Sequence, residues 1–249
     1  MTKRINVHFL ASQTSPDVLA GKTVVVIDVL RATTTITYAL ASGAKAVIPC
    51  LTVEDARETA RREKEPVLLG GERGGLPIDG FDLANSPSDY IPEKIKGQCI
   101  VFTTTNGTKA MMQCRLAERT LIGAFANLSA LVAELAEAPV TELLCAGTRG
   151  EITREDVLLA GAIIERVAGH RAGNCLLNDQ AAIAADAWIG LDLESSDSGI
   201  LAAILRETRG GRRLVEIGLE RDIEMAARID QVTIVPELDP RTRRIRIGH

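Results

Sequence analysis

The sequence predicts an α/β protein in which helices cover both faces of a mostly parallel sheet, a three-layer α/β/α arrangement. Apolar segments of strand length alternate with helical segments along the 249 residues, and this alternation is typical of parallel strands joined by right-handed crossovers. In addition, one unit occurs three times: an apolar strand enters a loop of Thr, Gly and charged residues, and a helix follows. The strands of these units lie near Val24, Ile100 and Leu143.

The first unit contains an unbroken apolar run, residues 24–28, that ends in an acid. Such a run is expected of a strand covered on both faces. Residues 33–41 are predicted to be helical although they begin with threonines, which are poor helix formers; this indicates that the threonine side chains cap the helix or bind a ligand. A short strand at 46–49 follows, and Thr52 is predicted to cap a charged helix that ends near Arg62.

The second unit repeats the first at a constant offset of 75 residues, which aligns Val26 with Val101 and Thr33 with Thr108. Between the two units, a short strand at 67–69 opens into a long Gly-rich stretch that continues to residue 87. A loop of that length inside a compact domain is more often functional than a mere connection.

The third unit runs from a strand at 141–145 into a long helix at about 153–169, and after Gly173 the sequence becomes mainly helical. We therefore predict an α/β lobe over residues 1–172 and a mainly helical portion over 173–249 that packs on it, or one compact domain. The elements predicted in the second portion are helices at 178–189, 198–208 and 220–229, a break at 209–211, a closing strand at 231–235, and a solvated basic tail at 241–246.

Composition excludes several classes of protein. The net charge is -4 and aromatic residues make up 3% of the chain, so the chain has neither a general basic field nor stacking platforms for nucleic acid. No uninterrupted apolar run approaches membrane-spanning length. The five cysteines form no CxxC pair and the first residues lack the apolar core of a signal peptide, so we expect a cytoplasmic protein with reduced thiols.

The ends of the three strands indicate an anion site, because helix N-termini there offer unpaired N–H donors at the carboxyl edge of a parallel sheet. Asp28 ends the first strand, with Arg31 and Thr33 on the same turn; taken alone, Asp28 is equally well explained as a helix cap. Glu72 and Arg73 lie in the Gly-rich loop, and carboxylates suit a magnesium ion. For any single acid in that loop, turn chemistry in a solvated loop is the simpler explanation.

The segment 103–109 is the most phosphate-like part of the chain. Its threonines donate hydrogen bonds, Gly107 lets the backbone approach a ligand, and Lys109 supplies charge. It lacks the Gly-Lys-Ser/Thr ending of a nucleotide P-loop, and a Thr-rich strand end with an Asn-Gly turn is the alternative. In the third loop Asp156 lies in the first turn of the following helix, so the helix dipole or a capping box with Thr153 is the alternative explanation.

Together these segments resemble the 2-phosphosulfolactate phosphatase family, the ComB-like proteins. The resemblance rests on ordered motifs at residues 27–34 (IDVLRATT), 71–75 (GERGG), 80–83 (GFDL), 85–87 (NSP), 104–108 (TTNGT), 146–148 (AGT) and 155–156 (ED). These motifs span roughly the first two thirds of the chain. One departure is Ala84, where the family pattern has Gly before Asn-Ser-Pro.

The resemblance implies a magnesium-dependent phosphatase that converts 2-phospho-3-sulfolactate into sulfolactate and phosphate, a step towards coenzyme M, on an α/β/α architecture distinct from the common phosphatase folds. Combined with the loops, it predicts three sets of site residues. The catalytic set is Asp28, Arg31 and Arg73; the metal set is Asp28, Glu72 and Asp156; the substrate set is Thr33, Thr104, Thr105, Asn106, Gly107, Thr108, Lys109, Thr148 and Arg149. The expected partner is a small anionic phosphorylated molecule.

Several alternatives stay open on sequence alone. Haloacid dehalogenase phosphatases also place an Asp after an apolar strand, but they need a second Asp where this chain has Leu30, so that family is disfavoured. A non-catalytic module that binds a phosphorylated metabolite, and a phosphatase for another phosphorylated hydroxy acid, both fit the same loops. The attacking group, Asp28 or a metal-bound water, is undecided. A homodimer is compatible with the size and apolar content.

Overall fold

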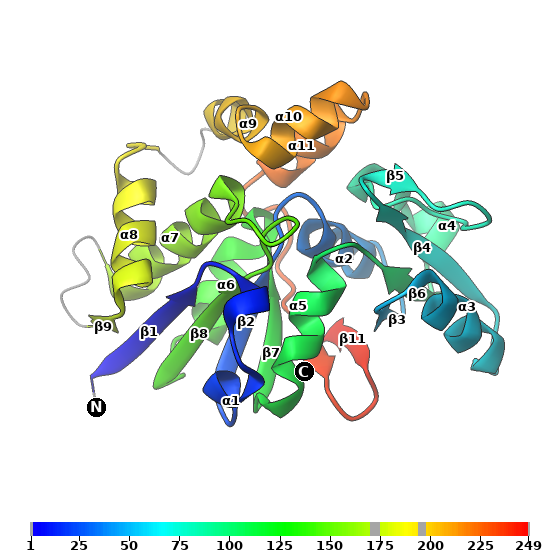
Figure 1. Cartoon of the computed structure of the whole chain (residues 1–249), viewed down its shortest axis with the longest axis horizontal. Coiled ribbons are helices and arrows are strands. Elements are labelled where there is room, and N and C mark those ends of the chain that lie inside the picture. Colours follow the sequence, from blue (N-terminus) through cyan, green and yellow to red (C-terminus); the bar gives the residue numbers. More distant parts are fainter. Residues whose placement is uncertain (1, 170–174, 194–197, 249) are drawn as a thin grey trace.

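The computed structural model describes residues 2–169, 175–193 and 198–248. Within them one sheet of eleven strands has the order β5-β4-β6-β3-β11-β10-β7-β2-β8-β1-β9, and Figure 1 shows helices packed around it. The strands are β1 (Lys3–His8), β2 (Thr23–Ile27), β3 (Ala46–Cys50), β4 (Val67–Arg73), β5 (Leu76–Pro77), β6 (Cys99–Thr103), β7 (Arg119–Gly123), β8 (Val140–Cys145), β9 (Cys175–Leu177), β10 (Pro236–Asp239) and β11 (Arg244–Ile247).

The helices lie between the strands in the sequence, as the predicted alternation requires. They are α1 (Pro16–Leu19), α2 (Ala32–Ala41), α3 (Val53–Arg62), α4 (Pro92–Ile95), α5 (Gly107–Gln113), α6 (Leu128–Glu134), α7 (Arg154–Ala168), α8 (Asp179–Ile189), α9 (Ser198–Arg206), α10 (Arg209–Glu216) and α11 (Glu220–Ala226). Short 3-10 helices occur at Ala11–Gln13, Pro87–Asp89, Cys114–Leu116 and Phe125–Asn127. As predicted, Thr52 caps α3 by accepting a hydrogen bond from the Asp55 N–H at 2.9 Å.

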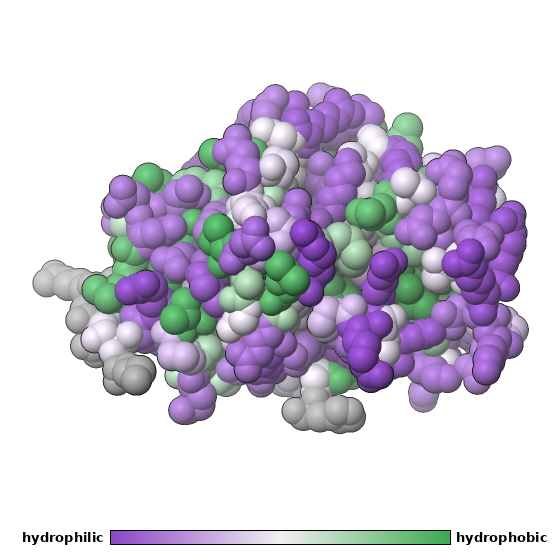
Figure 2. Space-filling view, turned by 60° about the horizontal axis from the view of Figure 1, so that its bottom comes forward, coloured by the Kyte–Doolittle hydropathy of each residue, from purple (hydrophilic) through white to green (hydrophobic). Residues whose placement is uncertain are grey.

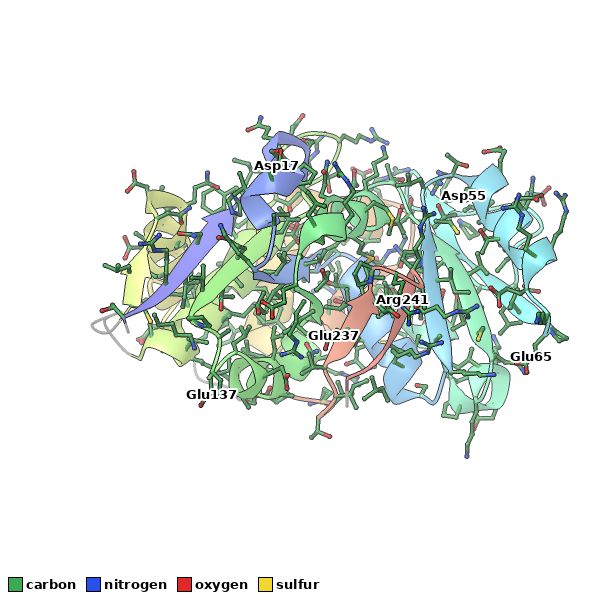
Figure 3. The ribbon with its side chains drawn as sticks, turned by 90° about the horizontal axis from the view of Figure 1, so that it is seen from below. Asp17, Asp55, Glu65, Glu137, Glu237 and Arg241 are labelled. Carbon is green, nitrogen blue, oxygen red and sulfur yellow. The ribbon has the colours of Figure 1, made fainter. Side chains whose placement is uncertain are left out.

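The sheet consists of two parallel blocks. Strands β9, β1, β8, β2 and β7 are parallel neighbours, and so are β3, β6 and β4. The hairpin β10–β11 joins the blocks by antiparallel pairing to β7 and β3. Figure 3, in which Glu237 and Arg241 are labelled, shows this hairpin between the two blocks. The expected mostly parallel sheet is confirmed.

Residues on β2 show how the three layers arise. Val25 and Ile27 point to one face and pack in a core cluster with residues of α6, α7 and α8. Val24 and Val26 point to the other face and pack with residues of α2 and α5. Successive strand residues alternate between faces, so an unbroken apolar run is what a sheet buried on both faces needs. The α/β/α prediction is confirmed.

Two predictions for the C-terminal part were wrong. The strand predicted at 231–235 begins only at Pro236, and the tail predicted to be solvated contains β11, which is hydrogen-bonded inside the sheet. Ile245 is fully buried, and Arg244 forms an ion pair with Glu63 at 2.6 Å. The alternation Arg-Ile-Arg-Ile has the period of a strand, but its arginines are equally typical of a charged surface tail.

The break predicted at 209–211 was also wrong, because these residues form the first turn of α10. Thr208 caps the helix by accepting from the Gly211 N–H at 3.0 Å. A Cβ on Gly211 would collide with the carbonyl oxygen of Leu205, and one on Gly210 would collide with a carboxylate oxygen of Glu155. The two glycines therefore allow close packing of the helix rather than ending it.

The division after residue 172 remains a prediction; the chain beyond it supplies β9, β10 and β11 to the same sheet as the first lobe. The predicted helices there are present as α8, α9 and α11, and Figure 1 shows α9, α10 and α11 gathered beyond one edge of the sheet.

On the face shown in Figure 2, hydrophobic residues lie in small groups between hydrophilic ones. In the part of the chain that the structure describes, no helix combines the length and the apolar character needed to cross a membrane.

Candidate active site

A cavity of about 570 Å³ lies where β2, β4, β6 and β8 end. It brings together residues that are far apart in the sequence. Eight of the predicted site residues line it: Asp28, Arg31, Glu72, Thr104, Thr105, Asn106, Thr148 and Arg149. The carboxyl ends of the strands of both parallel blocks thus converge on one site.

Asp28 directly follows β2 and is 8% exposed. Thr33 fixes its backbone, because the Thr33 hydroxyl donates to the Asp28 carbonyl at 2.9 Å and accepts from the Asp28 N–H at 3.0 Å. Burial raises the pKa of the Asp28 carboxyl to about 7; the Ala32 N–H opposes this rise, and repulsion from Glu72 and Glu155 adds to it. Asp28 can therefore gain or lose a proton near neutral pH.

Gly107 makes room for this carboxylate at the start of α5. A Cβ at that position would lie 2.7 Å from Asp28 Oδ2 and 2.5 Å from the Ala32 Cβ. Any larger residue would displace Asp28 or separate the first turns of α2 and α5. The predicted close approach at Gly107 is thus an approach to a carboxylate of the protein itself.

Glu72 joins two of the loops around the cavity. One of its oxygens accepts from the Thr105 N–H at 2.7 Å, and the other accepts from the Gly75 N–H at 2.6 Å and from the Thr105 hydroxyl at 3.2 Å. These bonds tie the turn after β4 to the loop after β6. They also hold a buried carboxylate at the cavity wall, where its charge acts on Asp28.

Arg31 is held by a residue that sequence reasoning missed. Its guanidinium donates to Asp222 at 2.6 Å and to the Gly75 carbonyl at 2.8 Å. The second carboxylate oxygen of Asp222 accepts from the Ser86 hydroxyl at 2.5 Å. Arg31 and Asp222 are almost fully buried, so this pair fixes the guanidinium at the cavity.

Asn85, in the cavity wall, carries a buried polar atom that has no partner among the described residues. It is 3% exposed, and within the described residues its Oδ1 has no hydrogen-bond partner. A buried polar atom without a partner usually indicates a bound ion or molecule. In the sequence, Asn85 belongs to the Asn-Ser-Pro motif and to the oxygen-bearing residues near Glu72 that suit magnesium.

Oxygen donors suited to a hard cation therefore surround one side of the cavity. They are the carboxylates of Asp28 and Glu72 and the amide oxygen of Asn85, which is the chemistry that magnesium prefers. Asp156 lies outside the lining, where its two oxygens accept from the Val29 N–H at 2.9 Å and the Gly147 N–H at 3.1 Å. Within the described ranges, no three His, Cys, Asp or Glu side chains form a group that could hold a metal ion.

Burial, and then repulsion from Asp28 and Glu155, raises the pKa of the Asp156 carboxyl well above its usual value. Its two backbone partners belong to the loops after β2 and β8. Asp156 therefore joins these loops behind the cavity.

Five other predicted site residues do not line the cavity either. Arg73 donates to the Glu72 carbonyl and the Thr103 hydroxyl, both at 2.7 Å. The Thr108 hydroxyl donates to the Thr104 carbonyl at 3.0 Å, and Lys109 is exposed. The remaining two are Thr33 and Gly107, whose contacts with Asp28 are described above. Apart from Lys109, these residues form contacts within the loops around the cavity and do not line the cavity themselves.

The largest feature missed from sequence is the contribution of α10. Arg209, Arg212, Arg213 and Glu216 all line the cavity. Their spacing i, i+3, i+4, i+7 places them on one helical face, and this was the signal available in the sequence. The two glycines between the arginines predict a break instead, because glycine disfavours a helix interior.

His8 lies outside the cavity lining and is bonded to the buried Glu142 at 2.7 Å. The other two histidines, His170 and His249, lie outside the described residues.

The fold and the site together define an α/β enzyme whose cavity combines a near-neutral carboxyl with arginines and hydroxyls, as suits an anionic ester. The chain belongs to the 2-phosphosulpholactate phosphatase family, whose model matches residues 9–241. It is thus a phosphoric monoester hydrolase, and the resemblance of its motifs to this family is confirmed.

Relatives named "Probable 2-phosphosulfolactate phosphatase" cover most of the chain. The protein of Caldanaerobacter subterraneus subsp. tengcongensis is 40% identical over 222 residues, 88% of this chain and 89% of the relative. That of Symbiobacterium thermophilum is 41% identical over 220 residues, 88% and 91% of the two chains. That of Thermotoga maritima is 42% identical over 217 residues, 87% and 89%.

Proposed function

We propose that this protein hydrolyses 2-phospho-3-sulfolactate to 3-sulfolactate and inorganic phosphate, in a magnesium-dependent, cytoplasmic step towards coenzyme M. The names of its relatives support the substrate. The observation that carries the proposal is the cavity itself, which joins Asp28, with its pKa of about 7, to a fixed Arg31 and a row of threonines. The substrate carries phosphate, sulfonate and carboxylate, so it needs such concentrated positive charge in an otherwise acidic protein.

Asp28 is the proposed proton-transferring or attacking group. In one route its carboxylate accepts a proton from the water whose oxygen bonds to phosphorus. The phosphorus–oxygen bond of the ester breaks, and the Asp28 carboxyl passes the proton to the leaving oxygen. In the other route the carboxylate itself attacks phosphorus and expels the sulfolactate oxygen, which takes up a proton, and water then hydrolyses the resulting aspartyl phosphate at phosphorus. In the metal-free site the Asp28 carboxyl has a pKa of about 7, so its carboxylate form is available for either route at neutral pH. A phosphoryl group found covalently attached to Asp28 after turnover is quenched with acid identifies the second.

Arg31 is proposed to bind the phosphoryl oxygens as negative charge spreads over them in a loose transition state. Its pairing with Asp222 at 2.6 Å leaves other N–H groups of the guanidinium for the substrate. Thr104, Thr105, Asn106 and Thr148 supply hydroxyl, amide and backbone donors around the same group.

Magnesium is proposed as the cofactor, held by Asp28, Glu72 and the unpartnered amide oxygen of Asn85. Bound there, it would supply positive charge to the phosphoryl oxygens. Magnesium usually takes one or two carboxylates together with phosphate oxygens, so a site with few acids suits it when the substrate is present.

The test is release of phosphate from 2-phosphosulfolactate by the purified protein, with magnesium and with a chelator. We expect turnover that the chelator abolishes and added magnesium restores. Calorimetry run in parallel separates the alternatives: binding of the ester without phosphate release would instead favour a metabolite-binding module. Faster release from another phosphorylated hydroxy acid, such as 2-phospholactate, would identify a phosphatase of different specificity.

A further inference from the structure

Helix α10 spans the cavity from one wall to another. Near its start, a Cβ on Gly210 would lie 3.5 Å from the Leu30 Cβ in the loop after β2. Just after its end, Ile217 Cδ1 would lie 3.3 Å from a Cβ on Gly75, in the turn between β4 and β5. The helix is thus anchored to two of the loops that carry the proposed catalytic residues.

Three arginines of α10 face this cavity. The side chains of Arg209, Arg212 and Arg213 are 46%, 63% and 48% exposed, and all three line the cavity. Their partners are local and solvated: Arg209 pairs with Glu151, and Arg213 pairs with Glu216 at 3.2 Å. Exposed pairs of this kind are weak, so an anionic ligand can replace them with little penalty.

The positive excess of the cavity lies on this side. Among the described residues of its lining, five are arginines and three are carboxylates. On the strand-end side, the charge of Arg31 is already matched by Asp222. The arginines of α10 are paired only with exposed carboxylates, Arg212 with Glu207 at 4.0 Å among them. The guanidinium of Arg149 makes no ion pair among the described residues.

We propose that Arg212 and Arg213 bind the acidic group of the substrate that does not react, and that they give the enzyme its preference for polyanionic phosphate esters. This inference rests on the proposed function, with the phosphate at the strand ends. Arg209 lies at the first position of the helix, beside Glu151. Arg212 and Arg213 lie at mid-helix, and the cavity of about 570 Å³ has room for a three-carbon acid between them and Asp28.

The test compares two substrates. 2-Phosphosulfolactate carries acidic groups for the arginines, whereas p-nitrophenyl phosphate carries only the reacting phosphate. We expect Arg212→Gln and Arg213→Gln each to lower kcat/KM for 2-phosphosulfolactate by about tenfold, the order of one charge-assisted hydrogen bond, and for p-nitrophenyl phosphate by less than about twofold. The Lys variants, which keep the charge, should recover part of the loss.

Arg221→Gln is the matched control, because Arg221 is exposed on the neighbouring helix α11 and does not line the cavity. It removes the same charge and should leave both substrates unaffected. Equal losses on the two substrates would reduce the arginines to a general electrostatic or structural role and overturn the inference, and so would the absence of any loss.

Calorimetry with 3-sulfolactate gives a second measurement that does not depend on turnover. Weaker binding by the Arg212→Gln/Arg213→Gln double variant, with unchanged binding by Arg221→Gln, supports the subsite. This holds even if the parent protein releases no phosphate, because that result would contradict only the proposed function. The opposite result is also informative. If the double variant binds 3-sulfolactate as well as the parent does, and the parent hydrolyses 2-phosphosulfolactate, the proposed subsite is wrong and the proposed function is retained.

Discussion

The two sides of the cavity are built in opposite ways. On the strand-end side, Asp28, Arg31, Glu72 and Asn85 are 3% to 8% exposed, and most of their polar atoms are held by backbone groups or buried partners. On the α10 side, the arginines are about half exposed and pair with solvated neighbours. Fixed, buried groups suit a reaction whose transition state needs exact placement, whereas adaptable exposed charges suit recognition of an acid.

The difference also extends to electrostatics. Burial raises the pKa of Asp28 to about 7 and raises that of Glu155. The ionised forms of these carboxyl groups are therefore destabilised on the strand-end side. Functional sites commonly retain such destabilising features because catalysis uses them. Substitutions on this side should therefore lower activity strongly, whereas the free energy of unfolding should rise for some substitutions and fall for others.

The largest expected effect is that of Asp28→Asn. The substitution keeps the shape of the side chain but removes its ability to exchange a proton or attack phosphorus, so we expect kcat to fall by at least about a thousandfold. Phosphate release from 2-phosphosulfolactate and from p-nitrophenyl phosphate measures this loss, which should be similar for the two esters. Activity equal to that of the parent would remove Asp28 from the mechanism.

Next in size is the buried pair between Asp222 and Arg31. Asp222→Asn leaves the Arg31 charge without its partner in a buried position, and breaking such a pair typically costs about 3–5 kcal/mol. Urea unfolding should show this loss, and kcat should fall at least tenfold in protein that is still folded. Glu65→Gln removes the exposed partner of Lys45 and should change neither property; a similar loss there would mean that burial is not the cause.

The third prediction concerns pH, in the presence of a chelator. Asp28 has a pKa of about 7 in the folded protein against 3.8 for its ordinary value, so the folded state keeps this proton where the unfolded state has lost it. The resulting stabilisation is complete below the ordinary pKa and is lost as pH rises through 7. From pH 5 to pH 8 the free energy of unfolding should fall by about 3 kcal/mol through this group.

Asp28→Asn should lack that decrease and be more stable than the parent at pH 8. Denaturant unfolding at the two pH values measures the difference, with Asp17→Asn, an exposed acid, as a control that keeps the behaviour of the parent. Parallel pH profiles for the parent and Asp28→Asn would show that the Asp28 proton does not contribute to folding.

The strand-end side was largely predictable from sequence, and the reason is local. An unbroken apolar run followed by Asp28 specifies a buried strand and its end, and the ends of parallel strands meet at one edge. Three repeated units therefore brought seven of the predicted residues to the cavity, and the strand before the Gly-rich stretch brought Glu72. What local pattern could not show is which side chains turn inwards, so Arg73 and Asp156 were assigned roles in the cavity although their atoms bond to the surrounding loops.

The α10 side and the centre of the sheet depend on distant contacts. Arg31 is paired with a residue 191 positions away, and no local periodicity reports such a pair. The glycines of α10 oppose helix formation by propensity, yet packing against Glu155 and Leu205 favours them. In β11 the charges of the arginines concealed a strand that pairs with β3 and β10 and buries Ile245 in the core.

The smallest expected effect is that of Asn85→Leu, which tests whether the unpartnered side-chain oxygen of Asn85 binds a cation. Asn85→Leu keeps the volume but removes a buried acceptor that has no partner among the described residues. The metal-free protein should therefore be as stable as the parent or more so, while magnesium should bind about 10–100-fold more weakly in calorimetry. Asn178→Leu provides the contrast: Asn178 caps α8 and bonds to Val7, so its loss should lower stability and leave magnesium binding intact. If Asn85→Leu instead destabilised the metal-free protein and bound magnesium normally, its amide would be a structural group and the cation site would have to be sought elsewhere on the cavity wall.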